Sequence, residues 1–188
     1  MAVAYQFHGH AIVSDDDMIA DAAGNMPGAL INASDWDRFQ RELDKSVALV
    51  LGRKGHLAHR NMHGRNRIVV SSTASGIEKR DDAWWWNPAT VPLADALAAA
   101  APAGGIVAVP GGQGVFDLFL ELGYDQFHLT RARGVKIPDG IAVFSECASG
   151  RSAEEVLARH GLVPAPSDIL DAATGVTVTV WRRGRTRA

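Results

Sequence analysis

The chain has 188 residues, of which 47% are hydrophobic and 21% charged, the balance of an ordinary globular domain. Its formal net charge is −2, so no overall positive field favours a nucleic-acid partner. Cys147 is the only cysteine, which excludes an intramolecular disulfide and a multi-cysteine zinc cluster. No apolar segment is long enough to span a membrane and Met1–His10 lacks a secretion signal, so we expect one cytoplasmic domain over residues 1–188.

The first strand is predicted at residues 8–13, where an apolar run ends in an acidic turn. Residues 24–28 are rich in turn-forming residues and predict a loop close to this strand. Such a loop is well placed to cover a binding site.

A helix is predicted over residues 34–43, with Ser34 as its N-cap. Asp35 and Phe39 are one turn apart on the same face and can line one pocket. Because acids in the first turn also stabilise a helix through its dipole, the residues alone leave open whether Asp35 is catalytic or structural.

The apolar run at residues 46–51 is typical of a buried strand in a parallel sheet. It leads into Gly52-Arg53-Lys54, and open α/β sheets bind ligands at the carboxyl ends of their strands. A solvated basic turn is the alternative. The next strand, at residues 67–70, ends similarly in the hydroxyl residues Ser71-Ser72-Thr73.

Two clusters of unusual composition follow. His56, His59 and His63 are close in sequence, but their spacing is not that of a metal-binding motif with accompanying acids, so we expect no metal. In Trp84-Trp85-Trp86, strand alternation buries one or two of the rings. Core packing is the favoured interpretation, and a partner surface, for example in a homodimer, is the alternative.

Residues 106–123 are the segment around which the chain is organised. A short apolar strand runs into Pro110-Gly111-Gly112-Gln113-Gly114, after which apolar residues recur at helical spacing up to Gly123. Glycines before a helix let the backbone approach a bound phosphate, and the free N–H groups of the helix bind it. The pattern predicts a cradle for a nucleotide diphosphate, with a plain tight turn as the alternative.

The remaining elements alternate in the manner of an α/β protein. They are a helix at 92–101, strands at 126–130 and 141–144, a helix capped by Ser152 at 152–160, and an antiparallel hairpin from 162–170 and 176–181. The arginines at 182, 183, 185 and 187 predict a solvated basic tail from about residue 183.

Taken in order, these segments resemble the dihydrofolate reductase fold family, which includes the reductase domain of riboflavin biosynthesis. The resemblance spans about Tyr5 to Arg183. It implies an α/β, three-layer fold with a mostly parallel central sheet, helices on both faces and a C-terminal antiparallel hairpin. It also implies NADPH as the cofactor and a small molecule as the substrate.

The resemblance further implies roles for individual residues. On the substrate side, Asp35 is the active-site carboxylate, Phe39 packs on the substrate ring, Thr130 supports Asp35, Arg65 binds an acidic group, and Ile19 contacts the substrate. The residues implied to bind the cofactor are Gly52, Arg53, Lys54, Ser71, Ser72, Gly111, Gly112, Gln113, Gly114 and Val115. In the family a cis peptide joins the glycine pair.

The chain departs from the family pattern around the substrate. Gly28 and Ala29 follow Pro27 where the family has a tryptophan, and Gly55 stands at a usual threonine. Three functions are therefore considered: an NADPH-dependent reductase of a pterin-like C=N bond, a free-standing riboflavin-pathway reductase of a ribosyl-aminopyrimidine, and a nucleotide-binding protein without catalysis. The zinc deaminase that usually accompanies the riboflavin-pathway reductase needs a zinc site with two cysteines, so the single cysteine excludes it here.

Overall fold

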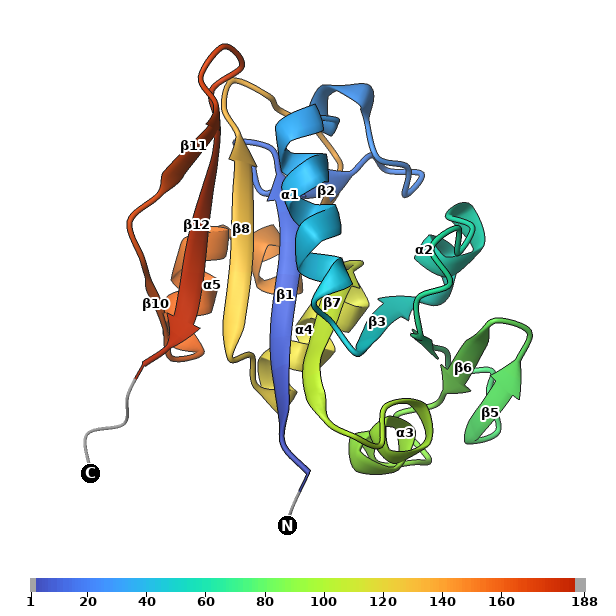
Figure 1. Ribbon diagram of the computed structural model, residues 1–188. Coiled ribbons are helices and arrows are strands. Elements are labelled where there is room, and N and C mark those ends of the chain that lie inside the picture. The colour runs from blue at the N-terminus through green and yellow to red at the C-terminus, as the bar shows by residue number, and fades with distance from the viewer. Residues whose placement is uncertain (1–2, 185–188) are drawn as a thin grey trace.

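The computed structural model describes residues 3–184, which form one large twisted sheet covered by helices (Figure 1). The strands of this sheet are β1 (Tyr5–Val13), β3 (Ala48–Gly52), β4 (Arg67–Val70), β5 (Ile77–Arg80), β6 (Ala83–Trp86), β7 (Gly105–Gly111), β8 (Gln126–Ala132), β10 (Leu162–Pro164), β11 (Asp168–Asp171) and β12 (Val176–Arg183). Their order is β10-β12-β8-β1-β7-β3-β4-β6-β5, with β11 also paired to β12. A separate ladder joins β2 (Met18–Ala20) to β9 (Ile141–Ala142).

The middle of the sheet is parallel, because β8, β1, β7, β3, β4 and β6 all run in one direction. Parallel neighbours place their carboxyl ends at the same edge, where ligands bind in open α/β sheets. At the two sides the sheet becomes antiparallel, through β12 beside β8 and β5 beside β6. The mostly parallel sheet and the C-terminal antiparallel hairpin predicted from the sequence are thus confirmed.

Helices cover both faces of the sheet. They are α1 (Ala33–Asp44), α2 (Arg53–Ala58), α3 (Leu93–Ala100), α4 (Gln113–Leu122) and α5 (Ala153–Arg159), with short 3₁₀ helices at Gly28–Leu30 and Ser145–Ser149. On one face Leu43 of α1 packs with Leu49 and Leu51 of β3. The opposite core contains side chains of α3, α4 and α5, among them Phe119 and Leu157. In residues 3–184 no helix is long and apolar enough to cross a membrane.

At three element boundaries the structure differs from what the sequence indicated. Ser34 is not the N-cap of α1, because the side chain of Asn32 accepts a hydrogen bond from the Asp35 amide at 3.1 Å and the helix starts at Ala33. Gly52-Arg53-Lys54 is not a turn but the start of α2, with Gly52 as its extended N-cap. The strand expected at 141–144 ends at Ala142, and a 3₁₀ helix follows.

The C-terminal region also differs in detail from the prediction. The first arm of the hairpin is split into β10 and β11 around Pro164 and Pro166, since a proline nitrogen cannot donate to a strand ladder. Arg182 and Arg183 belong to β12 rather than to a solvated tail, and Arg183 donates to the carbonyl oxygen of Tyr124 at 2.7 Å. Arg185 and Arg187 lie outside the described residues.

The tryptophan run occupies β6, opposite β5 in a hairpin that the sequence did not predict. Trp86 is 1% exposed and its indole N–H donates to the carbonyl oxygen of Val91 at 2.8 Å. Trp84 and Trp85 are half-buried on opposite faces of the sheet, each beneath a cation of β5. Core packing, the favoured interpretation of this run, therefore accounts for the rings.

Candidate active site

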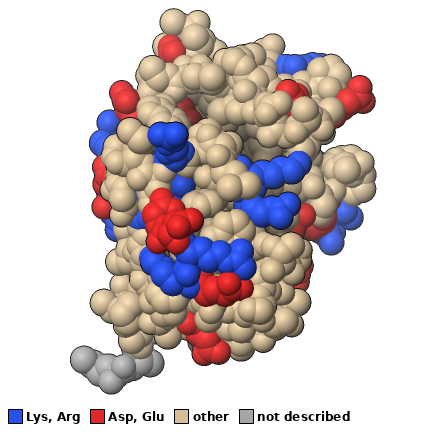
Figure 2. All heavy atoms as spheres, turned by 90° about the vertical axis from the view of Figure 1, so that its right-hand side faces the viewer, with Lys and Arg blue, Asp and Glu red and all other residues tan. Residues whose placement is uncertain are grey.

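A large cleft lies between α1, α2, the loop before α1 and the carboxyl ends of β3 and β7. Its volume is about 1560 Å³, more than a typical site for one drug-sized ligand and enough for a dinucleotide beside a second ring. Figure 2 shows this face of the molecule, with Lys and Arg side chains around its hollowed middle. The cleft is therefore the candidate active site.

The only carboxylate lining the cleft within residues 3–184 is that of Asp35. Thr130 on β8, only 2% exposed, donates its hydroxyl hydrogen to Asp35 Oδ1 at 2.6 Å. Burial raises the pKa of the Asp35 carboxyl, while the Thr130 hydrogen bond and the nearby Arg38 oppose the shift. A buried acid that faces a cleft and can accept further hydrogen bonds is a candidate for substrate binding and proton transfer.

Phe39 lies one helical turn after Asp35 and also lines the cleft. Its ring centroid is 5.9 Å from that of Trp36 and 5.8 Å from that of His10. Trp36 remains 55% exposed at the mouth of the cleft. The side of α1 that bears Asp35 therefore offers aromatic surface to a planar ligand.

Opposite Asp35, the segment from β7 into α4 lines the cleft with Gly111, Gly112, Gln113, Gly114 and Val115. The Gly111–Gly112 peptide is cis, as the resemblance implied. A Cβ added at Gly112 or Gly114 would meet no protein atom within 4 Å, whereas one at Gly111 would collide with Phe116. The space beside Gly112 and Gly114 thus belongs to the cleft, next to the free N–H groups that begin a ten-residue helix.

The Gln113 side chain ties this segment to the neighbouring ladder, because its amide nitrogen donates to the carbonyl oxygen of Ala142 in β9 at 3.1 Å. Ile19 of β2, the strand paired with β9, lines the cleft as well. The ladder therefore closes one end of the cleft between the Asp35 side and the glycine segment.

Positive charge dominates the walls of the cleft. Six Lys and Arg side chains of the described chain line it: Arg38, Arg53, Lys54, Arg60, Arg65 and Arg67. They face one carboxylate, although the whole chain has a net charge of −2. This local excess of positive charge favours an anionic ligand, such as a nucleotide with two phosphate groups.

Three of these arginines have hydrogen-bond partners in the protein: Arg38, which lies 2.7 Å from His128 Nδ1, Arg65 and Arg67. Arg65 donates to Asp44 at 2.6 Å and to the Gln40 side-chain oxygen at 2.7 Å, so its guanidinium is largely engaged before any ligand binds. Arg67 is 8% exposed and donates to the carbonyl oxygen of His59 at 2.7 Å, which anchors the loop after α2. Arg53 and Lys54, at the exposed start of α2, have no such engagement among the described residues.

Ser71 and Ser72 follow β4 but do not line this cleft. Ser71 is 7% exposed, and its hydroxyl lies 2.9 Å from that of Thr73. Ser72 is exposed, and its carbonyl oxygen accepts from Asn87. Their contact with a cofactor stays a prediction.

The three histidines near α2 do not all line the same pocket. His56 lies 3.9 Å from Asp82, in a smaller pocket of about 440 Å³, whereas His59 and His63 line the main cleft. Across the part of the chain that the structure describes, no three His, Cys, Asp or Glu side chains converge as metal ligands.

The sequence interpretation overlooked three cleft residues: His10, Arg38 and His128. His10 and His128 are paired in the β1–β8 register, and Arg38 lies on α1 above them. The alternation of His8 and His10 along a predicted strand was the available signal, because a polar residue at every second position marks a face that is not purely core.

No protein-family model and no curated protein sequence matches the chain. Among solved structures, dihydrofolate reductase from Enterococcus faecalis, complexed with NADP(H) and RAB-propyl, is 16% identical, with a TM-score of 0.64 over 95% of this chain and 96% of that one. The chain has the dihydrofolate reductase-like fold. A protein from Shewanella sp. PV-4 assigned to riboflavin biosynthesis has a TM-score of 0.65 at 18% identity, covering 96% and 99% of the two chains.

The dihydrofolate reductase-like fold confirms the fold that the sequence motifs implied. It covers nearly the whole chain. Because one fold can host several activities, the residues of the cleft must carry the functional argument.

Proposed function

We propose that the protein is an NADPH-dependent reductase that transfers a hydride to a pterin-like C=N bond. The observation that carries the proposal is the division of one cleft into two halves. A glycine segment and unpaired cations form one half, and a buried Asp35 beside Phe39 forms the other. When bound, NADPH would supply the hydride, and the protein would supply position and charge.

The cofactor half has the features that a dinucleotide requires. Gly112 and Gly114 leave open space for a diphosphate beside the start of α4. Arg53 and Lys54 stand at the start of α2 across the cleft and can bind a 2′-phosphate. The residues present therefore fit NADPH.

In the substrate half, Asp35 would accept two hydrogen bonds from the amidine edge of a ring. Thr130 occupies one oxygen lone pair of Asp35 and fixes the carboxylate in the cleft. Phe39 would pack against the ring face. By balancing the positive charge that develops when the ring nitrogen is protonated, Asp35 would favour hydride transfer to the adjacent carbon.

A ribosyl-aminopyrimidine is the second candidate substrate, since the Shewanella protein is as similar in structure as the dihydrofolate reductase. NADPH oxidation should be measured against dihydrofolate, other dihydropterins and ribosyl-aminopyrimidines. Turnover of a pterin supports the main proposal, and turnover only of the pyrimidine supports the second. Tight NADPH binding without any turnover would indicate a nucleotide-binding protein instead.

Arg53→Ala is expected to weaken NADPH binding by about 1.5–3 kcal/mol, the range for hydrogen bonds to charged groups. NADH, which lacks the 2′-phosphate, should lose much less. Titration of both cofactors into wild type and variant tests this expectation. Equal losses for NADPH and NADH would show that Arg53 does not contact the phosphate.

Gly112→Ala is expected to impair cofactor binding while leaving the fold intact, because its Cβ would enter open cleft space and meet no protein atom. Gly114→Ala is a companion variant on α4, where alanine favours the helix. Thermal unfolding and NADPH titration should be compared for both. Unchanged NADPH affinity in two folded variants would rule out the glycine segment as a cofactor cradle.

A further inference from the structure

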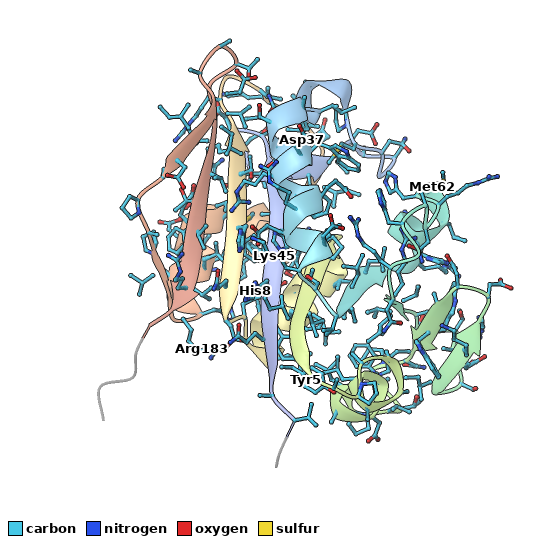
Figure 3. All side chains as sticks on the ribbon, in the orientation of Figure 1. Tyr5, His8, Asp37, Lys45, Met62 and Arg183 are labelled. Carbon is cyan, nitrogen blue, oxygen red and sulfur yellow. The ribbon has the colours of Figure 1, made fainter. Side chains whose placement is uncertain are left out.

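A polar cluster lies in the floor of the cleft, beneath α1. His10 on β1 and His128 on β8 are register partners with ring centroids 4.4 Å apart, and they are 5% and 6% exposed. His8 continues the cluster along β1 towards the C-terminal end of α1, where Figure 3 labels it beside Lys45. This part of the cleft floor is therefore polar.

The cluster lies directly beside the proposed substrate carboxylate. Thr130, which binds Asp35, is two residues beyond His128 on β8. Two residues along a strand correspond to about 7 Å. Groups that bind neighbouring edges of one heterocyclic ring are separated by a distance of this order.

His128 holds Arg38 in place. A guanidinium nitrogen of Arg38 lies 2.7 Å from His128 Nδ1. Because a guanidinium can only donate, Nδ1 must accept and the imidazole proton must lie on Nε2. Burial, and then the positive charge of Arg38, lower the pKa of His128 to about 3, so this neutral form dominates at physiological pH.

Arg38 has no ion-pair partner among residues 3–184. Glu42, one turn further along α1, is instead bound to Lys45 at 2.7 Å. His10 lines the cleft and makes no side-chain hydrogen bond within the described residues. The floor therefore presents a half-buried cation with unused donors, and an unpartnered imidazole, to whatever ring Asp35 holds.

We propose that Arg38 and His10 are specificity-determining residues that donate hydrogen bonds to an oxo group of the substrate ring, on the edge next to the one held by Asp35. The proposal rests on the proposed function and names the residues that recognise the oxo group of its substrate. A second amino group at this place would set donor against donor, so diamino rings are disfavoured.

The test uses two ligands that differ in one substituent, pterin (amino and oxo) and 2,4-diaminopteridine. Each is titrated into the NADPH-saturated protein, with quenching of tryptophan fluorescence as the signal, since Trp36 lines the cleft. Arg38→Met should shift the ratio of the two affinities by about tenfold or more towards the diamino ring. His10→Leu should shift it in the same direction by less.

Arg41→Met is the matched control, because Arg41 is an exposed residue of the same helix that does not line the cleft. It should leave the affinity ratio unchanged. A general loss of packing in Arg38→Met would weaken both pteridines equally, and an unchanged ratio in this variant overturns the proposal.

The ligand titration and the turnover assay separate this inference from the proposed function. If dihydropterins are reduced but the ratio does not respond to Arg38→Met, the specificity inference fails and the reductase stands. If wild type binds NADPH but neither pteridine, the inference fails together with the pterin substrate, and only the cofactor half of the proposed function survives.

Discussion

Asp35→Asn should reduce turnover by about 10²-fold or more, the scale of general acid–base assistance. The substitution keeps the size of the side chain and an acceptor for Thr130 but removes the charge. Since that charge matters most when the ring nitrogen is protonated, the loss should appear in turnover and barely in NADPH affinity. Steady-state kinetics and cofactor titration measure the two effects separately.

The pH dependence of Asp35→Asn follows from the same carboxylate. At low pH the ring can take its proton from solvent, so the difference in turnover between variant and wild type should shrink.

Burial raises the pKa of Asp35 in the folded protein above its unfolded value. The folded state then binds more protons, and wild-type stability falls as pH rises through the interval between the two pKa values. Asp35→Asn should therefore be more stable than wild type at neutral pH.

Asp37→Asn is the control for both effects, because Asp37 is exposed on α1 and does not line the cleft. It should be nearly silent in turnover and stability. Full activity of Asp35→Asn on the true substrate would mean that Asp35 serves only to start α1, and the proposed active site would be wrong.

Arg131→Met should destabilise the fold by about 3 kcal/mol, because it leaves buried charge without a partner. Arg131 on β8 donates to Asp17 at 2.8 Å, to Glu154 at 2.6 Å and to the Ser14 carbonyl oxygen at 2.8 Å. Asp17 is mostly buried and its backbone has a positive φ of 65°. The cluster therefore fixes the turn between β1 and β2 and links it to α5.

Chemical denaturation measures the loss in Arg131→Met. Glu154→Gln is the comparison: it should cost under about 1 kcal/mol, because the Glu154 side chain is 41% exposed and Arg131 retains Asp17. Similar small losses in both variants would show that the Arg131–Asp17 pair is not a main anchor of this turn.

The elements predicted well from the sequence are those with strong local signals. The strand–glycine–helix segment at 106–123 combines an apolar run, a glycine cluster and helical periodicity, and it forms β7 and α4 as expected. Ser152 caps α5 as predicted, and Glu155 completes a capping box with it. In these cases the residues that decide the structure are neighbours in the chain.

The features that the sequence did not reveal depended on distant partners or on competition between similar residues. The Arg38–His128 contact joins residues 90 positions apart, so no local pattern reveals it. Asn32 and Ser34 are both good N-caps, and tertiary contacts of Asn32 with Asp171 favour the earlier start of α1. The β5–β6 hairpin turns at the charged pair Asp81-Asp82, where Asp81 has a φ of 46° without a glycine to mark the turn.

Transfer of deuterium from labelled NADPH tests the central claim most directly. NADPH carrying deuterium at the reactive carbon of the nicotinamide would be incubated with each dihydropterin and ribosyl-aminopyrimidine, and the products analysed by mass spectrometry. The account predicts one deuterium in a reduced pterin-like product, formed much more slowly by Asp35→Asn. If no labelled cofactor is oxidised and no product contains deuterium, the assignment of the cleft as a reductase site is contradicted.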